Sequence, residues 1–386
     1  MTKILLLFIT LLASCVGTDK PPTSPKVLNS SSAIDKKPLR IAIIGLVHDH
    51  VHWMMLNRKK IGDIEIVAIV EANQELVKKY SQKYGFSTDI VFNTIEEMLA
   101  HIKPEAVTAF NMTSEHLKVV EACAPLGIHI MLEKPLATSL VDAKKMFNLA
   151  NQYQVQLLTN YETSWYPSIR ETYRLIHQEN LIGEIRRIII NVGNRGPIEV
   201  GCKAEFIEWL IDPKFNGAGA LADFGCYGTN LATWFMKGAP PTRVNCLTQQ
   251  FKPELYPKVD DDATLILTYP KAQVIIQASW HWSLNRKDIE IYGSKGHIIC
   301  KNSKDMIIMK YGQGDARSQV APPLDPGLYD GFAYLRKVIR ENDPVRPFSP
   351  SALDNNLLVM RVYEAAKQSS ETAQTIYFKT FESTLK

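Results

Sequence analysis

The positions of apolar residues divide the chain at about residue 160. From residue 39 onward, short apolar segments alternate with stretches in which apolar residues recur at helical spacing. We predict five strands at 40–45, 64–70, 106–110, 128–132 and 155–159, and five helices at 50–59, 74–84, 94–101, 115–124 and 139–153. Strands that alternate with helices form mostly parallel sheets covered on both faces. The sequence therefore predicts an α/β domain with a doubly wound parallel sheet over residues 39–160.

The second half of the chain has a different pattern. After one predicted helix at 167–177 it is rich in strand segments, some of them joined by hairpin-like turns such as Tyr269-Pro270-Lys271. The predicted strands are 184–192, 243–249, 263–269, 273–281, 288–292 and 298–301, and a last helix covers 349–368. We therefore expect residues 161–386 to form an α+β C-terminal domain with a large, mostly antiparallel open sheet.

The composition is that of a soluble globular protein. Of the 386 residues, 46% are hydrophobic and 22% are charged. The formal net charge of +4 is too small, and the basic residues are too scattered, to indicate a nucleic-acid binder. After residue 15, the sequence has no apolar stretch of the roughly 18 residues that a membrane-spanning helix needs. We expect a small molecule, not a nucleic acid, as the partner.

The first residues have the pattern of an export signal. Lys3 precedes the apolar run 4–12, and Leu12-Ala13-Ser14-Cys15 resembles the lipobox of bacterial lipoproteins, in which the cysteine is acylated. We predict a signal peptide at 1–14, lipidation of Cys15 and a flexible tether at 15–38, rich in Ser, Pro, Thr and Lys. The mature protein would be exported and anchored to a membrane only by this lipid, facing the periplasm. A plain signal peptide that contains a cysteine is the alternative.

The cysteines do not form a recognisable pattern. The chain has six, none of them in a Cys-x-x-Cys pair. If Cys15 is lipidated, an odd number remains, which predicts buried thiols instead of a disulfide framework.

Three of the nine histidines lie directly after the first predicted strand, in Gly45-Leu46-Val47-His48-Asp49-His50-Val51-His52-Trp53. In amidohydrolases built on a β/α barrel, a His-x-His segment at this place supplies the first ligands of the metal site. Such a site needs more ligands at later strand ends, and the barrel needs eight strands. Within the parallel region only His129 lies at a predicted strand, at its start, and only five parallel strands are predicted. We therefore expect no metal.

The alternative for this segment is the phosphate-binding turn of a nucleotide fold. A strand, a glycine, a short turn and a helix present the helix N-terminus to a pyrophosphate in the Rossmann fold. Gly45 keeps the first glycine of the G-x-G-x-x-G fingerprint, whereas Val47 and His50 replace the other two. Glu71 follows the next strand, where a carboxylate can accept both ribose hydroxyls of NAD and would repel the 2′-phosphate of NADP. We predict an NAD-binding Rossmann domain at 39–160, with NADP the less favourable cofactor.

A charged pair, Glu133-Lys134, directly follows the predicted strand 128–132 and precedes Pro135. Ligands of a doubly wound sheet bind at the carboxyl ends of its strands, so Lys134 is expected in the cofactor crevice. This E-K-P motif resembles the hallmark of the Gfo/Idh/MocA oxidoreductases, and the resemblance covers about residues 39–385. It includes Asn160-Tyr161-Glu162…Tyr166-Pro167, Leu181-Ile182-Gly183-Glu184-Ile185 and Ile291-Tyr292-Gly293-Ser294-Lys295-Gly296.

The resemblance implies a second catalytic segment at 217–227. Many family members have D-x-G-x-H there, and this chain has Asp223 and, in place of the histidine, Tyr227. That resembles the glucose–fructose oxidoreductase and dihydrodiol dehydrogenase branch, in which a tyrosine transfers the proton. Because the ordinary pKa of tyrosine is about 10, we expect the Lys134 ammonium to lower the pKa of Tyr227 and to hydrogen-bond the substrate oxygen. A helix cap at Asp223 and a core tyrosine are the structural alternative.

These considerations define the expected site. Catalysis is assigned to Lys134, Tyr227 and Asp223. The residues expected at the cofactor are Gly45, Leu46, His48, His50, Glu71, Asn111, His116, Glu133 and Lys134, and those expected at the substrate are Tyr161, Trp165, Tyr166, Asn194 and Arg195. The loss of two glycines, and Asn111-Met112 in place of the family's usual Thr-Pro, are departures that bear on cofactor binding.

The resemblance implies an exported NAD(P)-dependent oxidoreductase that transfers hydride from a CH–OH group of a sugar, a polyol or a related substrate. Two alternatives remain open. One is a glycoside-cleaving enzyme that oxidises a sugar transiently and reduces it again on the same NAD, and the other is a sugar-binding lipoprotein that has lost its cofactor. We also consider a homo-oligomer assembled through the C-terminal sheet.

Overall fold

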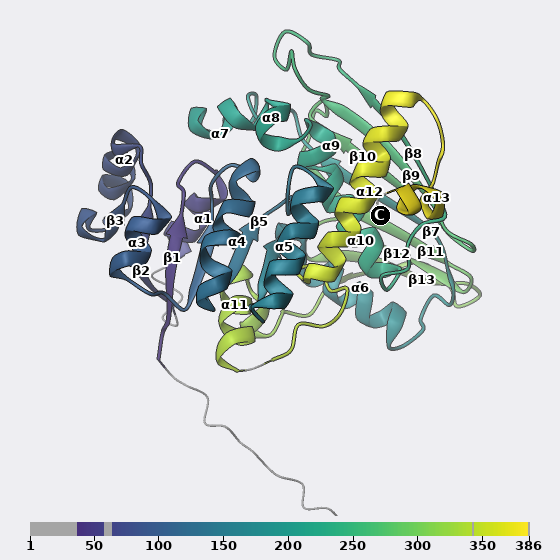
Figure 1. Cartoon of the computed structure of the whole chain (residues 1–386). Helices are drawn as coiled ribbons and strands as arrows, with labels where there is room; N and C mark the ends of the chain where they lie inside the picture. Colours follow the sequence, from purple (N-terminus) through teal and green to yellow (C-terminus); the bar gives the residue numbers. More distant parts are fainter. Residues whose placement is uncertain (1–36, 58–63, 342, 385–386) are drawn as a thin grey trace, which may run out of the picture. The chain divides into compact units, whose positions relative to one another are not determined.

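The computed structural model describes residues 37–57, 64–341 and 343–384 (Figure 1). Its first sheet has six parallel strands in the order β3-β2-β1-β4-β5-β6. The strands are β1 (Leu39–Ile44), β2 (Ile64–Val70), β3 (Val91–Phe92), β4 (Ala106–Ala109), β5 (His129–Glu133) and β6 (Leu157–Asn160). This is the strand order of a Rossmann fold, and the order reverses between β1 and β4. The expected parallel domain is confirmed, with β3 as an additional short strand.

Helices cover both faces of this sheet: α1 (His50–Asn57), α2 (Gln74–Tyr84), α3 (Ile95–His101), α4 (His116–Cys123) and α5 (Leu140–Gln152). Their starts follow from local sequence. The Asn73 side chain accepts hydrogen bonds from the first backbone N–H groups of α2, and the Ser139 side chain does the same for α5. Residues 58 and 59 of the expected helix 50–59 lie outside the described part of the chain.

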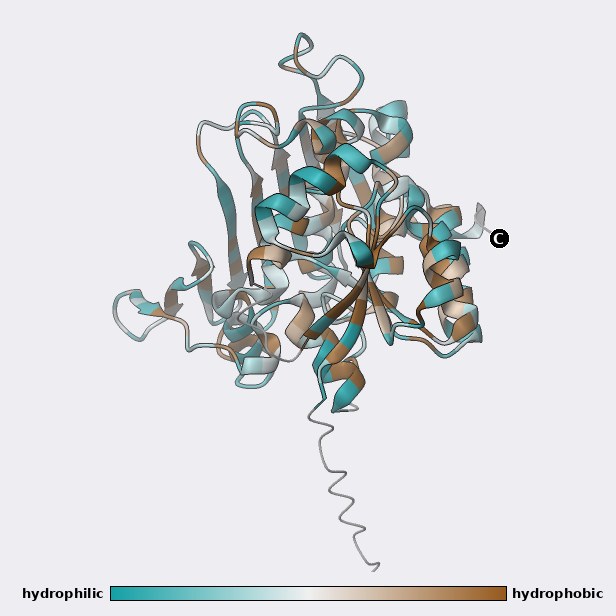
Figure 2. Cartoon of the chain, turned by 90° about the vertical axis from the view of Figure 1, so that its left-hand side faces the viewer, coloured by the Kyte–Doolittle hydropathy of each residue, from teal (hydrophilic) through white to brown (hydrophobic). Residues whose placement is uncertain are grey.

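Alternate residues of β1 face opposite sides of the sheet. Ile41 and Ile43 pack in a cluster with α1 and α2, whereas Ala42 and Ile44 belong to a cluster that includes α4 and α5. In Figure 2 the strands nearest the viewer are brown along most of their length, while the helices around them are banded in teal and brown. Strands buried on both faces require this continuous apolar sequence, which is why the pattern revealed them.

The second sheet has nine strands in the order β14-β13-β12-β11-β7-β10-β9-β8-β15. All neighbours are antiparallel except β7 and β10, which are parallel. The strands are β7 (Ile185–Gly193), β8 (Arg243–Gln249), β9 (Asp262–Thr268), β10 (Gln273–Ser279), β11 (Arg286–Gly293), β12 (Gly296–Cys300), β13 (Asp305–Lys310), β14 (Arg317–Val320) and β15 (Ile376–Tyr377). The expected large, mostly antiparallel sheet is confirmed.

The remaining helices connect and cover the two sheets. They are α6 (Pro167–His177), α7 (Ala204–Leu210), α8 (Pro213–Asn216), α9 (Ala220–Asp223), α10 (Gly225–Phe235), α11 (Gly331–Arg340), α12 (Leu353–Thr372) and α13 (Phe378–Thr384). Every residue of α10 is buried, because the helix lies between the second sheet and α12. The shorter helices α7, α8 and α9 precede α10 and bring Asp223 to the first domain.

One helix of the second half returns to the Rossmann sheet. Phe332, Leu335 and Val338 of α11 are buried in the same cluster as Leu39 and Ile41 of β1. The chain therefore crosses from the first sheet to the second and back.

Among the described residues, no helix combines the length and apolar character that a membrane crossing requires. The five cysteines in this part of the chain are free thiols, four of them buried and Cys202 half-buried. The expected signal peptide, the tether and Cys15 lie outside the described residues, apart from the last two tether positions.

Candidate active site

The site begins at the switch point between β1 and β4. Gly45 follows β1 with φ +82°, and a Cβ atom placed on it would lie 2.7 Å from Cβ of Asn111, which follows β4. Gly45 N–H donates to the carbonyl of Val70 at 2.8 Å. The left-handed conformation and the contact with Asn111 both require glycine here, as the fingerprint predicts.

Glu71 closes the first turn from the end of β2. Its Oε2 accepts the Leu46 N–H at 2.9 Å, and its Oε1 accepts the Asn73 N–H at 2.9 Å. Burial raises the pKa of Glu71, although these backbone N–H groups oppose the effect. Beside it lies a pocket of about 410 Å³, which Gly45, Glu71 and Asn111 help to line. A pocket of this size beside a carboxylate fits the adenosine half of a dinucleotide.

The turn has Val47 and His50 at the positions of the two missing glycines, and His48 lies between them. His50 N–H donates to Nδ1 of His48 at 3.1 Å, and His48 N–H donates to the carbonyl of Phe110 at 2.9 Å. The His48 ring is buried and packs against Phe206 and Trp209 of α7, with ring centroids 4.7 and 5.7 Å away. Burial lowers the pKa of His48 well below its usual value. His48 is therefore neutral, as expected for a histidine at a helix N-terminus.

Glu133 of the E-K-P motif is buried and held by two groups. Its Oε2 lies 2.8 Å from Nδ1 of His50, and its Oε1 accepts the Asn160 side-chain N–H at 2.7 Å. Trp165 Nε1–H in turn donates to Oδ1 of Asn160 at 2.9 Å. Although burial favours the neutral acid, the charge and hydrogen bond of His50 keep the pKa of Glu133 below its usual value. His50 and Glu133, 83 residues apart in sequence, thus meet in one cluster.

Lys134 is buried beside Asp223. Its ammonium group forms an ion pair and a short hydrogen bond with Oδ1 of Asp223, and Trp280 Nε1–H donates to Oδ2 at 2.9 Å. Burial alone would lower the pKa of Lys134, but the Asp223 carboxylate raises it. Lys134 and Asp223, which the sequence assigned to catalysis separately, thus form an ion pair, and Asp223 balances the charge of the lysine.

Tyr227 lies next to this pair, but its ionisation differs from the expectation. Burial, followed by the charge of Glu162, raises the pKa of Tyr227 well above 10. The ammonium of Lys134 lies 5.1 Å from the centre of the Tyr227 ring, over its face, and pairs with Asp223. The lowering of the pKa of Tyr227 by Lys134 was therefore a wrong expectation, because desolvation dominates. Tyr227 is a protonated phenol in this environment.

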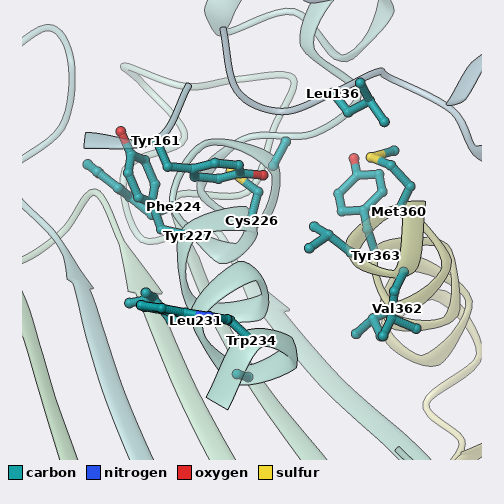
Figure 3. Packing of buried hydrophobic residues seen from close by; sticks show 14 of the residues in the cluster. Leu136, Tyr161, Phe224, Cys226, Tyr227, Leu231, Trp234, Met360, Val362 and Tyr363 are labelled. Atoms are coloured by element: carbon teal, nitrogen blue, oxygen red, sulfur yellow. The ribbon is translucent and has the colours of Figure 1, made fainter. Parts of the chain in front are cut away.

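The other expected substrate residues separate into two groups. Tyr161 is fully buried and meets Tyr227 edge to face, with centroids 5.3 Å apart (Figure 3). Trp165 and Tyr166 line a second pocket of about 450 Å³ together with His50, Trp53 and Tyr329.

Asn194 and Arg195 belong to a different network. Oδ1 of Asn194 accepts the Gly196 N–H at 2.8 Å, and the exposed Arg195 donates to the carbonyl of Glu199 at 3.3 Å. The described contacts do not bring either residue to Lys134.

Two polar atoms among the predicted cofactor residues lack hydrogen-bond partners within the described part of the protein. They are Oδ1 of Asn111 and Nε2 of His116, both of them buried. His116 Nδ1 is 3.0 Å from the carbonyl of Leu136, and burial lowers its pKa to about 4. Unpaired buried polar atoms are costly unless a ligand satisfies them. With Glu71 and its pocket, these atoms fit a bound dinucleotide and a polar substrate.

Two residues of the site were not found from the sequence. Trp280 supports Asp223 from the end of β10, and Glu162 pairs with Lys287 of β11. Trp280 lies 57 residues after Asp223, so no local motif connects the two. In the sequence, Trp280 and Trp282 alternate on one strand face, a pattern that fits core packing or a subunit interface as well as a role in the site.

A Rossmann domain whose crevice holds a buried lysine, followed by a mostly antiparallel sheet, defines a class of two-domain dinucleotide-binding oxidoreductases. Two family models match the chain: the oxidoreductase family with an NAD-binding Rossmann fold over residues 39–161, and the Gfo/Idh/MocA C-terminal domain over residues 170–299. The chain belongs to the Gfo/Idh/MocA family of oxidoreductases.

Individual relatives are distant. The trans-1,2-dihydrobenzene-1,2-diol dehydrogenase of Xenopus tropicalis is 25% identical over 61% of this chain and 67% of its own length. The scyllo-inositol 2-dehydrogenase (NADP⁺) of Bacillus subtilis is 20% identical over 86% of this chain and 96% of its own. The aldose-aldose oxidoreductase of Caulobacter crescentus, solved with glycerol, is 20% identical and superposes with a TM-score of 0.75 over 88% of this chain and 100% of its own. At this identity the last match shows the fold alone.

Proposed function

We propose that the chain oxidises or reduces a CH–OH group of a sugar, a polyol or a related molecule with NAD(P). The observation that carries the proposal is the buried Lys134–Asp223 pair at the end of β5, beside the Rossmann switch point. A charge is buried at such a cost only where a partner balances it, and perturbed pairs of this kind concentrate at catalytic sites. The relatives named for a diol and an inositol are consistent with a substrate that carries hydroxyl groups.

Each catalytic residue has a distinct proposed role. The Lys134 ammonium hydrogen-bonds the reacting oxygen and stabilises negative charge on it. The Tyr227 phenol, protonated at neutral pH, donates its proton to this oxygen during reduction and takes it back during oxidation. Asp223 positions Lys134. A bound nicotinamide dinucleotide supplies the hydride acceptor or donor.

We propose NAD as the preferred cofactor. Glu71 lines the 410 Å³ pocket and would face the ribose, where its negative charge opposes a 2′-phosphate. The relative from Bacillus subtilis is named for NADP⁺, so the preference needs a direct test. Mass spectrometry of the nucleotide released from the denatured protein should find NAD. Calorimetric titration should show that Glu71→Ala brings the affinities for NAD and NADP closer together. Tighter binding of NADP than of NAD by the unaltered protein would contradict the preference.

The catalytic roles predict the behaviour of two variants. Lys134→Ala and Tyr227→Phe should each reduce turnover by on the order of 10²–10⁴-fold, because each removes a group that acts on the reacting oxygen. Steady-state rates on a hydroxylated substrate found by screening sugars and polyols test this, with circular dichroism to check the fold. A near-normal kcat in either variant would show that the role is wrongly assigned.

We also propose that the protein is exported and anchored through Cys15. The support is the sequence pattern before and after that residue. In a bacterial host, Cys15→Ser should move the protein from the membrane fraction to the soluble fraction. An unchanged distribution would contradict the lipid anchor.

The second sheet supports a further proposal, that copies of the chain associate through it. Along β9 the residues alternate strictly between buried and half-buried, so one face of the sheet is covered by the chain and the other is only partly shielded. Light scattering on the eluting protein is expected to give a mass above that of one chain.

A further inference from the structure

The pocket of about 450 Å³ that Trp165 and Tyr166 help to line has aromatic walls. Trp53 and Tyr329 belong to the same lining, and they are 39% and 58% exposed. Trp165 is buried and held in place, because its indole N–H donates to Oδ1 of Asn160 at 2.9 Å. Large aromatic side chains that remain open to solvent around one pocket indicate a surface that a ligand covers.

Polar groups lie among these aromatic rings. The Glu162 carboxylate accepts the Tyr166 hydroxyl at 2.5 Å and pairs with the ammonium group of Lys287. Since a carboxylate has about four acceptor positions, Glu162 keeps room for about two hydroxyl donors of a ligand. Lys304 of the same lining supplies an ammonium donor. Aromatic surface for the C–H groups of a ring, together with charged partners for its hydroxyl groups, fits a sugar.

The charge of the lining narrows the kind of sugar. Glu162 and Lys304 carry opposite charges, and His50, which also lines the pocket, pairs with the buried carboxylate of Glu133. The lining therefore lacks the excess of positive charge that would favour a phosphate group. An entirely apolar ligand would remove Glu162 and Lys304 from water without replacing their hydrogen bonds. A neutral ring that carries hydroxyl groups is the ligand that fits.

The pocket adjoins the catalytic residues through two sets of contacts. Lys287, the partner of Glu162, lies over the ring of Tyr227, with 5.1 Å between its ammonium nitrogen and the ring centre. Asn160, which lines the pocket, donates at 2.7 Å to Glu133, the residue before the catalytic lysine. A ligand in this pocket would therefore lie next to the reacting position.

The same pocket is separate from the one assigned to the adenosine half of the dinucleotide. Among the described residues, none lines both this pocket and the 410 Å³ pocket beside Glu71. Both pockets can therefore be filled at the same time.

We propose that the aromatic pocket binds a second sugar ring, so that the substrate is a disaccharide or a longer glycoside whose reacting ring lies at Lys134 and Tyr227. The inference rests on the proposed function, from which it takes a substrate that carries hydroxyl groups. The second ring packs against Trp53 and Tyr329 and donates hydroxyl groups to Glu162. This ring contributes affinity and orientation, and the chemistry stays at the first ring.

The test is calorimetric titration of the purified full-length chain without added dinucleotide. The probes are D-glucose and D-galactose, the disaccharides maltose, cellobiose and lactose, and phenyl β-D-glucoside. We expect at least one disaccharide to bind roughly 10-fold or more tightly than the monosaccharides it contains, because stacking and hydroxyl hydrogen bonds each add affinity. Equal affinities for monosaccharides and disaccharides, or no binding of any probe, would overturn the proposal. A gain for phenyl β-D-glucoside alone would overturn it too, since the pocket would then bind an apolar group.

Variants show whether the gain arises in this pocket. Trp53→Ala and Tyr329→Ala should each lower the ratio of disaccharide to monosaccharide affinity toward one. Tyr377→Ala changes a tyrosine on β15 that is 61% exposed, and it serves as the control in which the ratio is kept. Circular dichroism checks that the variants fold. An unchanged ratio in both test variants would show that the aromatic pocket takes no part in sugar binding.

This proposal and the proposed function fail separately. Sugar binding is measured without turnover, whereas the oxidoreductase activity is tested through released nucleotide and formation of NADH. A gain in disaccharide affinity without any formation of NADH would contradict the function and leave the second-ring pocket. Formation of NADH from monosaccharides, with no gain for any disaccharide, would contradict the second-ring pocket alone.

Discussion

At the scale of single residues, the site is organised around the ammonium group of Lys134. Asp223 balances its charge, and the Trp280 indole holds the other oxygen of the Asp223 carboxylate. The E-K-P motif singled out Lys134 and the D-x-G segment singled out Asp223, and the structure places the two side chains together. The sequence did not reveal Trp280, because it comes from a distant strand end and only the folded chain brings it to Asp223.

Removal of the negative partner should therefore destabilise the protein strongly. Asp223→Asn leaves a buried ammonium group without a counter-charge, and we expect a loss of about 3–5 kcal/mol in the free energy of unfolding. Trp280→Phe removes one hydrogen bond and should cost only about 1–2 kcal/mol. Urea unfolding at neutral pH compares the two variants. A loss below that of Trp280→Phe would mean that Lys134 is uncharged in the fold.

At the scale of elements, the short helix α7 covers the nucleotide turn. Lys203 N–H, just before α7, donates to Asp49 at 3.1 Å, and Glu205 of α7 pairs with Lys79 and accepts from the Tyr80 hydroxyl of α2. The apolar pattern did not reveal α7, α8 or α9, because helices of four to seven residues are too short to show a period. The long strands and helices of the first sheet were found because each buries a continuous apolar face.

This cover should slow the release of a bound dinucleotide. Glu205→Ala breaks the attachment of α7 to α2 without emptying the core, and we expect release of NADH to become about 3–10-fold faster. Stopped-flow fluorescence measures the rate, and Glu208→Ala, an exposed residue of the same helix, is the matched control. Equal rates in Glu205→Ala and in the control would show that α7 does not govern release.

A related experiment asks whether the cofactor is recycled. Protein loaded once with NAD and given substrate without further NAD should form many product molecules per chain if oxidation and reduction occur on the same bound cofactor. A burst of one equivalent would indicate an exchangeable cofactor.

The contact between α6 and α10 predicts a dependence of stability on pH. His177 of α6 packs on Tyr173 of the same helix, with 4.4 Å between ring centroids, and its ring lies 6.5 Å from that of Phe235 of α10. Burial lowers the pKa of His177 to about 4. Below about pH 6.5, His177 is protonated in the unfolded chain, whereas in the folded chain it stays neutral down to about pH 4. Stability is therefore lost as the pH falls through this window. Unfolding at pH 8 and pH 5 should therefore differ less in His177→Gln than in the unaltered protein; an equal difference would contradict this assignment.

At the scale of the whole molecule, the two sheets share one chain path. Residues 161–386 were expected to form a separate C-terminal domain, but α11 buries Phe332 and Leu335 against the Rossmann sheet. The sequence could predict two sheets because their hydrophobic periods differ. It did not predict α11, and an amphipathic helix does not specify which sheet its apolar face will cover.

The return of α11 predicts that residues 39–160 will not fold independently. Without α11, the cluster around Ile41 loses the buried side chains of Phe332, Leu335 and Val338, each worth about 1.5–3 kcal/mol of burial. The isolated segment should lack a cooperative thermal transition. In the full chain, Leu335→Ala should lower the free energy of unfolding by about 2–5 kcal/mol. A cooperative transition of the isolated segment would show that α11 is dispensable.

The thiol of Cys226 has a practical consequence. It is buried next to Tyr161 and Tyr227, it donates to the carbonyl of Asp223 at 3.3 Å, and burial raises its pKa to about 12 (Figure 3). Alkylating reagents attack the thiolate, so this cysteine is unreactive while the surrounding residues remain closed. Its rate of labelling, followed by peptide mass spectrometry against that of the half-buried Cys202, therefore records how often the buried residues of the candidate site become open to solvent. The rate at which Cys226 is alkylated thus measures how often the site opens, and no probe has to be introduced into the chain.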